Sequence, residues 1–437
     1  MNKIKIGFFF VFTAVSALAL QDDVSSRYLL FMRTQGQVFN EGYPDTYSEQ
    51  NMLEISTNFP PYSPTNKVNV GVGSMMSYFR YDIDTVEKSL RRFLELSEKL
   101  SIPIWLRLDG EHWLDGRPDL WNWWDPAKLG YNPENAKNVE WTWWSSEYAI
   151  KIAWRNWGRQ VRTTPTINLM SKDYIKANEK ALEQLIPIIA EWYKNLPEDK
   201  KDLFAGISGG GETAIGVNSY YYPNGNELVN KPESEDPPSR GLIIDDTLSR
   251  GMQQIGYAAV FSAGIRTNGD LTEDDVVEVV RRHLRNISKK MYELGIPKEK
   301  IFSHGFGNMT GEKLFDAAVN EYSNPGWSSY WHTDDVLKDK GVVRNISRPE
   351  VEQWAPVEWL LLYRTDETLR WENAIRNTLT APGAKLMCIL NWEGVTDPGS
   401  TVIKAVNGVL KEELNPRKLP QPHSGSYEKS LYEVMDN

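Results

Sequence analysis

The sequence predicts an α/β protein built as a (β/α)8 TIM barrel, with long tryptophan-rich insertions at the C-terminal face of the barrel. Apolar strand-like runs alternate with amphipathic helix-like runs along the 437 residues, which is the pattern of a parallel sheet covered by helices. A barrel of this kind usually takes about 250 residues but tolerates insertions that bring it above 400. An open doubly wound sheet would need a glycine-rich phosphate loop after its first strand, and RTQGQVF at Arg33–Phe39 is not one.

Eight strands are expected, each an apolar run bounded by polar or turn-forming residues. They are Tyr28–Arg33, Val68–Ser74, Ile102–Asp109, Leu203–Gly209, Lys300–His304, a short strand near Trp327–Trp331, a short strand ending near Glu358, and Lys385–Trp392. Helical periodicity predicts helices over Asp84–Leu100, Lys172–Asn195, Leu248–Ala263, Glu273–Leu294, Glu367–Thr380 and Thr401–Leu410. Asp82, Thr272 and Thr365 are expected N-caps, because their side-chain oxygens can accept the free N–H groups of a first helical turn.

One domain is expected between two terminal segments. Residues 1–20 have the pattern of a secretory signal peptide, in which two lysines precede an apolar run over 8–20 that contains Ala17-Leu18-Ala19. This pattern predicts a secreted or periplasmic protein. Residues 21–415 then form the barrel with its inserted loops, and residues 416–437 form a C-terminal tail. The signal run is too short to span a bilayer comfortably, and no later apolar stretch is long enough.

Charge and residue usage exclude several classes of partner. The formal net charge of −10 at pH 7 argues against nucleic acid. The one cysteine, Cys388, excludes an intramolecular disulfide, and its place in an apolar strand favours core packing over nucleophilic chemistry. No HxH or HExxH pattern occurs among the five histidines, so no metal is expected. The sequence does not determine the oligomeric state.

Ten of the seventeen tryptophans lie between Trp105 and Trp157, in a stretch crowded with acidic residues. A flat apolar ring beside hydrogen-bonding groups suits a sugar, and such mixtures line concave small-molecule sites. We therefore expect a carbohydrate-binding cleft to which Trp113 and Trp124 contribute. The alternative is a large aromatic satellite core under a long loop, in which the rings serve packing alone.

Three glutamates stand near the ends of expected strands, where barrels of this kind place their chemistry. Glu212 lies in ISGGGET, Glu358 in QWAPVEW and Glu393 in CILNWEG. Glycoside hydrolysis needs two carboxyl groups flanking one bond, a proton donor and a nucleophile or base. Burial beside aromatic rings would raise the pKa of a donor. The structural alternatives are that Glu358 begins an exposed helical turn and that Glu393 is a helix N-terminal charge.

Polar residues also follow the third expected strand. In LDGEHW, Asp109, Glu111 and His112 are predicted to bind substrate, because a carboxylate and an imidazole can bind sugar hydroxyls. The same residue types could hold a metal instead.

The ends of other expected strands carry further candidate residues. His304 in FSHGFG and Trp331 are predicted to contact the substrate, although a buried, hydrogen-bonded histidine is the alternative for His304. Arg33 ends the first strand and Arg107 lies inside the third. Each either orients the acidic groups or forms a structural ion pair.

The layout over most of residues 28–412 resembles the clan A glycoside hydrolases, and more loosely the family 42 β-galactosidases and their uncharacterised relatives. The resemblance implies a retaining mechanism, with an acid/base glutamate after strand 4 and a nucleophile after strand 7. Glu212 and Glu358 occupy these places in the expected strand order. The resemblance also implies a sugar-stacking aromatic at the end of strand 8, where Trp392 stands. Clan A commonly has Asn directly before the acid/base glutamate, and here that residue is Gly211.

We therefore expect a secreted glycoside hydrolase that cleaves a poly- or oligosaccharide without a cofactor. Glu212 would be the proton donor and Glu358 the nucleophile; a strand order shifted by one makes Glu393 the nucleophile instead. One alternative is a non-catalytic carbohydrate-binding barrel, which the missing Asn favours. The other is a polysaccharide lyase, with a base from Tyr220-Tyr221-Tyr222. The sugar, its linkage and endo or exo action do not follow from the sequence.

Overall fold

The computed structural model describes residues 26–33, 38–156, 160–215, 219–220, 254–306, 312–361, 367–395, 400–412 and 414. The predicted signal peptide, the predicted C-terminal tail and the predicted N-cap Thr365 lie outside these residues. No helix within the described ranges is long and apolar enough to cross a membrane.

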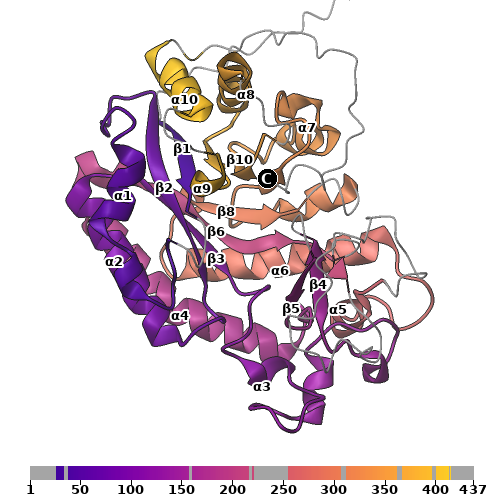
Figure 1. Cartoon of the computed structure of the whole chain (residues 1–437). Helices are drawn as coiled ribbons and strands as arrows, with labels where there is room; N and C mark the ends of the chain where they lie inside the picture. The colour runs from indigo at the N-terminus through magenta and orange to yellow at the C-terminus, as the bar shows by residue number, and fades with distance from the viewer. Residues whose placement is uncertain are drawn as a thin grey trace, which may run out of the picture.

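In the described part of the chain, eight parallel strands close into a barrel (Figure 1). They are β1 (Arg27–Met32), β2 (Val68–Ser77), β3 (Ile104–Asp109), β6 (Phe204–Thr213), β8 (Ile301–Gly305), β9 (Gly326–Ser329), β10 (Ala355–Trp359) and β11 (Leu386–Ile389). Each barrel strand pairs with the next one along the chain, and β1 pairs in parallel with both β2 and β11. The (β/α)8 architecture and all eight expected strands are therefore confirmed.

The alternation of side chains in β1 explains how the barrel buries both faces of its sheet. Tyr28, Leu30 and Met32 belong to a cluster that fills the barrel interior, whereas Leu29 and Phe31 join the larger core between the sheet and the helices. The interior cluster also contains Trp105, Ala205, Phe302, Ala355, Val357, Leu386 and Cys388. Cys388 is a buried free thiol, as expected of a core residue.

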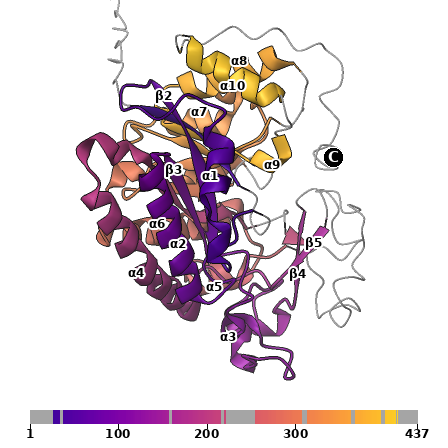
Figure 2. The same ribbon diagram turned by 60° about the vertical axis from the view of Figure 1, so that its left-hand side comes forward.

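Helices surround the barrel on its outer side (Figures 1 and 2). The longer ones are α1 (Glu49–Ser56), α2 (Ile83–Leu100), α4 (Lys172–Asn195), α6 (Glu273–Glu293), α8 (Thr368–Thr380) and α10 (Thr401–Lys411), with a shorter α7 (Lys340–Ile346). Asp82 caps α2 by accepting from the N–H groups of Asp84 and Thr85. Thr272 and Asp275 form a capping box at the start of α6. Both predicted caps within the described residues are confirmed.

The helix expected over Leu248–Ala263 is described in part, because residues 248–253 lie outside the described ranges. Within residues 254–263, the helical part is α5 (Tyr257–Ser262). Gly256 directly before α5 has a φ of 119°, a conformation that cannot continue a right-handed helix.

Two strand ends also differ from expectation. The strand predicted to end at Gly209 continues as β6 to Thr213, so Glu212 lies within the strand rather than after it. Trp392 does not end the last strand but begins the short helix α9 (Trp392–Val395). Asn391 accounts for this change, because its side chain accepts the N–H of Gly394 over 2.7 Å and so caps the helix.

The segment between β3 and α4 is the tryptophan-rich insertion. It contains α3 (Pro118–Trp121) and two strands of a small antiparallel sheet that the sequence did not predict. The sheet has the order β5 (Gln160–Thr163), β4 (Ala153–Asn156), β7 (Ser219–Tyr220), and β7 follows β6 in the chain. Figure 2 shows α3, β4 and β5 projecting from one side of the barrel.

Candidate active site

Glu212 and Glu358 converge at the C-terminal end of the barrel. Glu212 lies at the end of β6 and Glu358 in β10, and both side chains are buried. Tyr330, directly after β9, lies between them: its hydroxyl is 2.6 Å from Oε1 of Glu212 and also hydrogen-bonds to Oε1 of Glu358. One oxygen of each glutamate and one ring nitrogen of His304 all lie within 4.8 Å of one another. Two of the three predicted catalytic glutamates therefore form a close pair.

The contacts of Tyr330 bear on where protons lie in this pair. A phenol hydroxyl carries one hydrogen, so Tyr330 donates to one carboxyl group at a time. The second contact becomes a hydrogen bond when the other carboxyl group is protonated and donates to the phenol oxygen. Burial and the negative charge of Glu212 raise the pKa of Glu358 to about 7, against the opposing effects of Arg107 and Tyr330. The geometry thus suits a pair that shares one proton near neutral pH.

Arg107 forms a buried ion pair with Glu358. It projects from β3, and its Nη1 hydrogen-bonds to Oε2 of Glu358. Burial acts to lower the pKa of Arg107, but the charges of Glu358 and Glu212 raise it above its usual value, so the guanidinium stays charged. The hydrogen bond from Arg107 favours negative charge on Glu358.

The end of β6 leaves the regular barrel ladder just before Glu212. Gly209 pairs with Ser303 and Thr213 with Gly305, so an advance of four residues on β6 (209 to 213) matches two on β8 (303 to 305). The extra residues form a bulge. Glu212 within it has a φ of 54°, a left-handed conformation that is strained for any residue except glycine. Strain of this kind persists only where the surroundings hold the backbone.

Gly211 has no room for a side chain in this bulge. A Cβ there would lie 2.6 Å from Nδ1 of His112 and 2.8 Å from Oδ1 of Asp109. These two side chains are fixed, because Oδ2 of Asp109 lies 3.1 Å from Nδ1 of His112 and Oδ1 accepts the N–H of Glu111 over 2.8 Å. Burial opposes ionisation of Asp109, but His112 and Arg107 lower its pKa below the usual range. Asp109 and His112 therefore fill the space that an Asn before Glu212 would need.

Glu111 holds the other side of the bulge. Thr213 donates from Oγ1 to Oε1 of Glu111 over 2.7 Å, and the same oxygen lies 2.9 Å from Nε2 of His283 on α6. All three side chains are buried. Burial acts to raise the pKa of Glu111, but the hydrogen bond with His283 lowers it. Glu111 thus links Thr213, the residue after Glu212, to α6. The predicted substrate contacts of Asp109, Glu111 and His112 stay predictions.

His304 ends β8 beside the two glutamates. One ring nitrogen, Nε2, lies 2.9 Å from Oγ of Ser328, and Nδ1 has no hydrogen-bond partner among the described residues. Burial and the charge of Arg107 lower the pKa of His304 well below its usual value, so the ring is neutral. A neutral imidazole beside two carboxyl groups can bond to a sugar hydroxyl, which is the role that the sequence predicts for it.

Glu212, His304 and Glu358 also have the donor atoms and spacing that a metal ion could use. A cation at this point would compete with Arg107 and Tyr330, which already hydrogen-bond to oxygens of Glu358. The donor set is therefore a poor match for a divalent ion, and the expectation of no metal stays a prediction.

Glu393 belongs to a different cluster, near the C-terminal ends of β1 and β11. Its Oε1 accepts from Nε of Arg33 over 2.6 Å, and Arg33 also pairs with Glu54 at 3.1 Å. Trp392 donates from Nε1 to Glu54, and its ring packs 5.0 Å from that of Phe31. Trp392 is 4% exposed. The catalytic role of Glu393 and the stacking role of Trp392 stay predictions.

Five tryptophans of the insertion are tied to backbone carbonyl groups. The indole N–H groups of Trp121, Trp123, Trp124, Trp141 and Trp144 donate to carbonyl oxygens of Leu114, Ile150, Lys151, Ala136 and Gly269. Trp141 lies in a small buried cluster with Val139 and Tyr257, against which Trp123 packs. The alternative of an aromatic satellite core therefore describes this part of the insertion.

Three of the predicted substrate-binding tryptophans, Trp113, Trp124 and Trp331, are half-buried. Lys128 lies 5.3 Å over the ring of Trp124, and Arg80 lies 4.7 Å over that of Trp113. Trp331 directly follows Tyr330 and packs against a small cluster of Phe306, Tyr330 and Leu360. Trp331 therefore neighbours a residue that contacts both carboxyl groups.

Sequence reasoning missed Tyr330 and Ser328. The position of Tyr330 carried a signal, because it follows the sixth expected strand and precedes Trp331, itself a predicted site residue. Its bridging role depends on the spacing of β9 between the strands that carry the glutamates, which the sequence does not display.

No family model and no curated protein matches the sequence. Solved structures similar to the chain include a GH5 xyloglucan-specific β-1,4-glucanase from a ruminal metagenomic library. The two sequences are 10% identical, the match covers 92% of this chain and 98% of the glucanase, and the TM-score is 0.43. A GH5-4 broad-specificity endoglucanase from an uncultured bacterium has 9% identity, 87% and 94% coverage, and a TM-score of 0.41. A β-mannanase from the blue mussel Mytilus edulis has 10% identity, 88% and 92% coverage, and a TM-score of 0.41. Likeness this weak carries no argument about chemistry.

Proposed function

We propose that this chain is a glycoside hydrolase that cleaves poly- or oligosaccharides with retention of configuration. The observation that supports it most is the buried carboxyl pair, in which oxygens of Glu212 and Glu358 approach within 4.8 Å at the C-terminal end of the barrel. Retaining enzymes hold their carboxyl groups about 5–5.5 Å apart, whereas inverting enzymes need about 6.5–9.5 Å to admit a water molecule. The close approach favours retention.

The roles of the two glutamates follow from their hydrogen-bond donors. Tyr330 contacts both carboxyl groups, but Arg107 donates to Glu358, so negative charge is best stabilised on Glu358 and the role of proton donor is assigned to Glu212. The carboxylate of Glu358 attacks the anomeric carbon while Glu212 gives its proton to the leaving oxygen, and the glycosidic C–O bond breaks. Glu212 then removes a proton from water, whose oxygen attacks the same carbon and releases Glu358 from the ester. No cofactor takes part.

Glutamine variants of the three glutamates test this assignment. Reducing ends released from a panel of polysaccharides are counted for Glu212→Gln, Glu358→Gln and Glu393→Gln. We expect Glu212→Gln and Glu358→Gln to lose turnover while retaining sugar binding. We expect Glu393→Gln to retain turnover. Full activity in Glu212→Gln would end the assignment. Loss in Glu393→Gln with activity kept in Glu358→Gln would move the nucleophile to Glu393.

The same panel separates the alternative functions. A carbohydrate-binding barrel without catalysis binds sugars and releases no reducing ends. A lyase releases unsaturated products that absorb in the ultraviolet. Of the tyrosines considered for a lyase, Tyr221 and Tyr222 lie outside the described residues.

Proton NMR of the first products tests retention directly. We expect the newly formed anomeric centre to have the configuration of the bond that was cleaved. A product of opposite configuration would require an inverting mechanism and a different role for Glu358.

We also propose that the protein is exported. This proposal rests on residues 1–20, and N-terminal sequencing of the mature protein tests it. A mature chain that still begins at Met1 would contradict it.

A further inference from the structure

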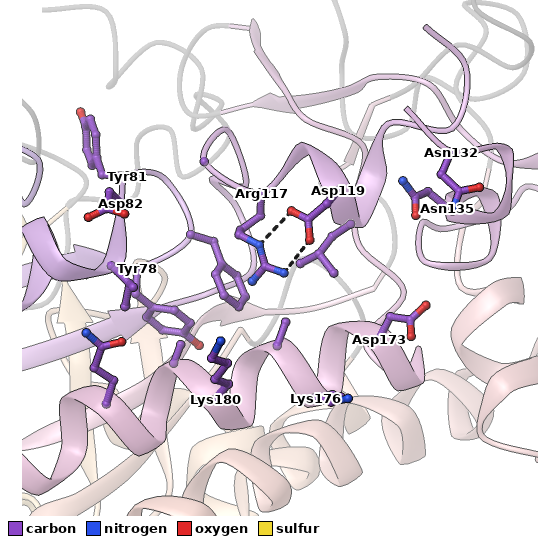
Figure 3. Close-up of a pocket in the computed structure, with 17 residues that line it drawn as sticks. Tyr78, Tyr81, Asp82, Arg117, Asp119, Asn132, Asn135, Asp173, Lys176 and Lys180 are labelled. Atoms are coloured by element: carbon purple, nitrogen blue, oxygen red, sulfur yellow. Dashed lines mark hydrogen bonds and ion pairs between the residues drawn. The ribbon is translucent and has the colours of Figure 1, made fainter. Parts of the chain in front are cut away.

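A cavity of about 600 Å³ lies on the outer flank of the barrel, and no residue of the carboxyl pair's surroundings lines it. It is enclosed by the β2–α2 connection, the part of the insertion around α3, and one face of α4 (Figure 3). Its volume falls within the range of small-molecule sites, about 300–1,000 Å³. Nothing in the proposed reaction uses this cavity.

The floor of the cavity is apolar. Phe79 and Leu120 line it and are buried in the core. Ala177 and Ala181, one turn apart on α4, complete it. Larger side chains at these two positions would fill the groove, so the alanines leave it open.

The rim of the cavity is charged and electrically balanced. Its charged lining residues are Arg117, Lys176 and Lys180 with Asp82, Asp119 and Asp173, three of each sign. Arg117 and Asp119 are joined by two hydrogen bonds of 2.9 and 2.7 Å, and the guanidinium lies 5.3 Å over the ring of Phe79. Figure 3 shows this pair above α4, from which Lys176 and Lys180 project. A balanced rim offers no net attraction to a polyanion or a phosphate ester.

We propose that this cavity is a second saccharide-binding site, which holds a neutral segment of a poly- or oligosaccharide. A sugar ring places its C–H face on an apolar floor, while its hydroxyls donate to carboxylates and accept from ammonium or guanidinium groups at the edge. The cavity offers all three kinds of contact. The ligand class rests on the proposed function, but binding here leaves Glu212 and Glu358 untouched and serves to anchor the polymer.

Calorimetric titration of the full chain carrying Glu212→Gln, which cannot turn over its ligand, tests the second site. The probes are neutral β-1,4-linked hexasaccharides of glucose, mannose and xylose. The cavity variant combines Asp173→Asn with Lys180→Ala. Its matched control combines Lys172→Ala with Glu179→Gln, two exposed positions on α4 that do not line the cavity.

We expect two hexasaccharides to bind per chain for at least one probe, in both the parent and the control. In the cavity variant one of the two affinities should fall about tenfold or more, the usual loss when charged hydrogen-bond partners are removed. Amides of residues 78–83 and 173–181 should exchange more slowly when the probe is bound.

Unchanged titrations in the cavity variant, or one binding event per chain in the parent, would overturn the second site. Hydrolysis of polysaccharide by the wild-type chain is measured separately. A chain that hydrolyses but binds nothing in the cavity refutes the second site alone, whereas a chain that binds there and hydrolyses nothing refutes the proposed function alone.

Discussion

Thr213 donates a hydrogen bond of 2.7 Å from Oγ1 to Oε1 of Glu111. The bond joins the residue after Glu212 to the connection that follows β3, at the point where β6 departs from its ladder with β8. Because Glu212 has a φ of 54°, the backbone around it needs such an anchor to stay in place.

The first prediction concerns this anchor. Thr213→Val keeps the shape of the side chain but removes the hydroxyl, which leaves a buried carboxylate with one partner fewer. We expect kcat to fall about tenfold to a hundredfold while KM changes little, because misplacement of a reacting group costs mainly the chemical step. Steady-state kinetics on a soluble oligosaccharide measure both constants. Thr213→Ser, which keeps the hydroxyl, is the control and should stay near wild type. Equal activity in both variants would mean that the bond serves stability alone.

The second prediction concerns the space beside Gly211. Gly211→Ala brings a Cβ against His112 and Asp109, and we expect a loss of about 1–3 kcal/mol in the free energy of unfolding, the usual cost of overpacking. Urea denaturation measures this loss. Removing the obstructing ring by His112→Ala in the same chain should restore part of the stability, so the two changes should be less than additive. Strict additivity would contradict the predicted contact.

The third prediction concerns the pH dependence of catalysis. Because the negative charge of Glu212 helps to raise the pKa of Glu358 to about 7, that value marks the loss of the one proton that the pair shares. The general acid needs this proton, so kcat/KM should fall as pH rises through neutrality. Tyr330→Phe removes a hydrogen bond that lowers this pKa, and the falling limb should move to higher pH. Tyr62→Phe, which removes a phenol bonded to the carbonyl of Asp199, is the control and should leave the profile unchanged. A falling limb near the ordinary glutamate value in wild type would contradict the shared proton.

The fourth prediction concerns Glu140, which lies in the insertion and is fully buried. Its Oε2 accepts the N–H of Gly256, directly before α5, over 3.0 Å. Burial raises the pKa of Glu140 from 4.5 to about 8, despite the backbone hydrogen bonds that oppose it. The folded state therefore holds a proton that the unfolded chain has already lost. The contribution of Glu140 to stability is complete below the pKa of the unfolded chain, 4.5, and is lost as pH rises through the folded pKa of about 8.

Glu140→Gln tests this linkage, because glutamine cannot ionise. Between the unfolded pKa of 4.5 and the folded pKa of about 8, the stability of the variant relative to wild type should increase with pH. The increase should be at most roughly 1.4 kcal/mol per pH unit. Urea unfolding at several pH values between 5 and 8 measures the difference. The exposed Glu179→Gln is the control and should give a constant difference. Parallel stability curves for Glu140→Gln and wild type would contradict the raised pKa.

The barrel could be predicted from the sequence because its signal is local. In β1, Tyr28 and Leu30 face the interior whereas Leu29 and Phe31 face the helices, so both faces are apolar and the strand is a continuous apolar run. The small sheet of the insertion gives no comparable signal. Its central strand β4 pairs with β7, more than sixty residues away, and such a pairing leaves no trace in either segment alone.

The candidate site could be predicted only in part. Glu212 and Glu358 stand out because carboxyl groups near strand ends meet at one face of a barrel. Tyr330 could not be assigned its bridging contacts, since they depend on how β9 lies between β8 and β10. Glu393 resembled the other two glutamates in sequence, but it lies in the short helix that Asn391 begins and its carboxylate pairs with Arg33, neither of which the sequence displays.

The imidazole of His112 occupies the volume beside position 211, and this has an evolutionary consequence. The two positions cannot diverge independently, although position 211 lies in β6 and position 112 in the connection after β3, about a hundred residues apart in the chain. Homologues that carry a bulkier residue at 211 are expected to carry a smaller one at 112, and lineages should pass between the two states by way of glycine. Once homologous chains are aligned, correlated exchange at these two columns would be the mark of this shared volume.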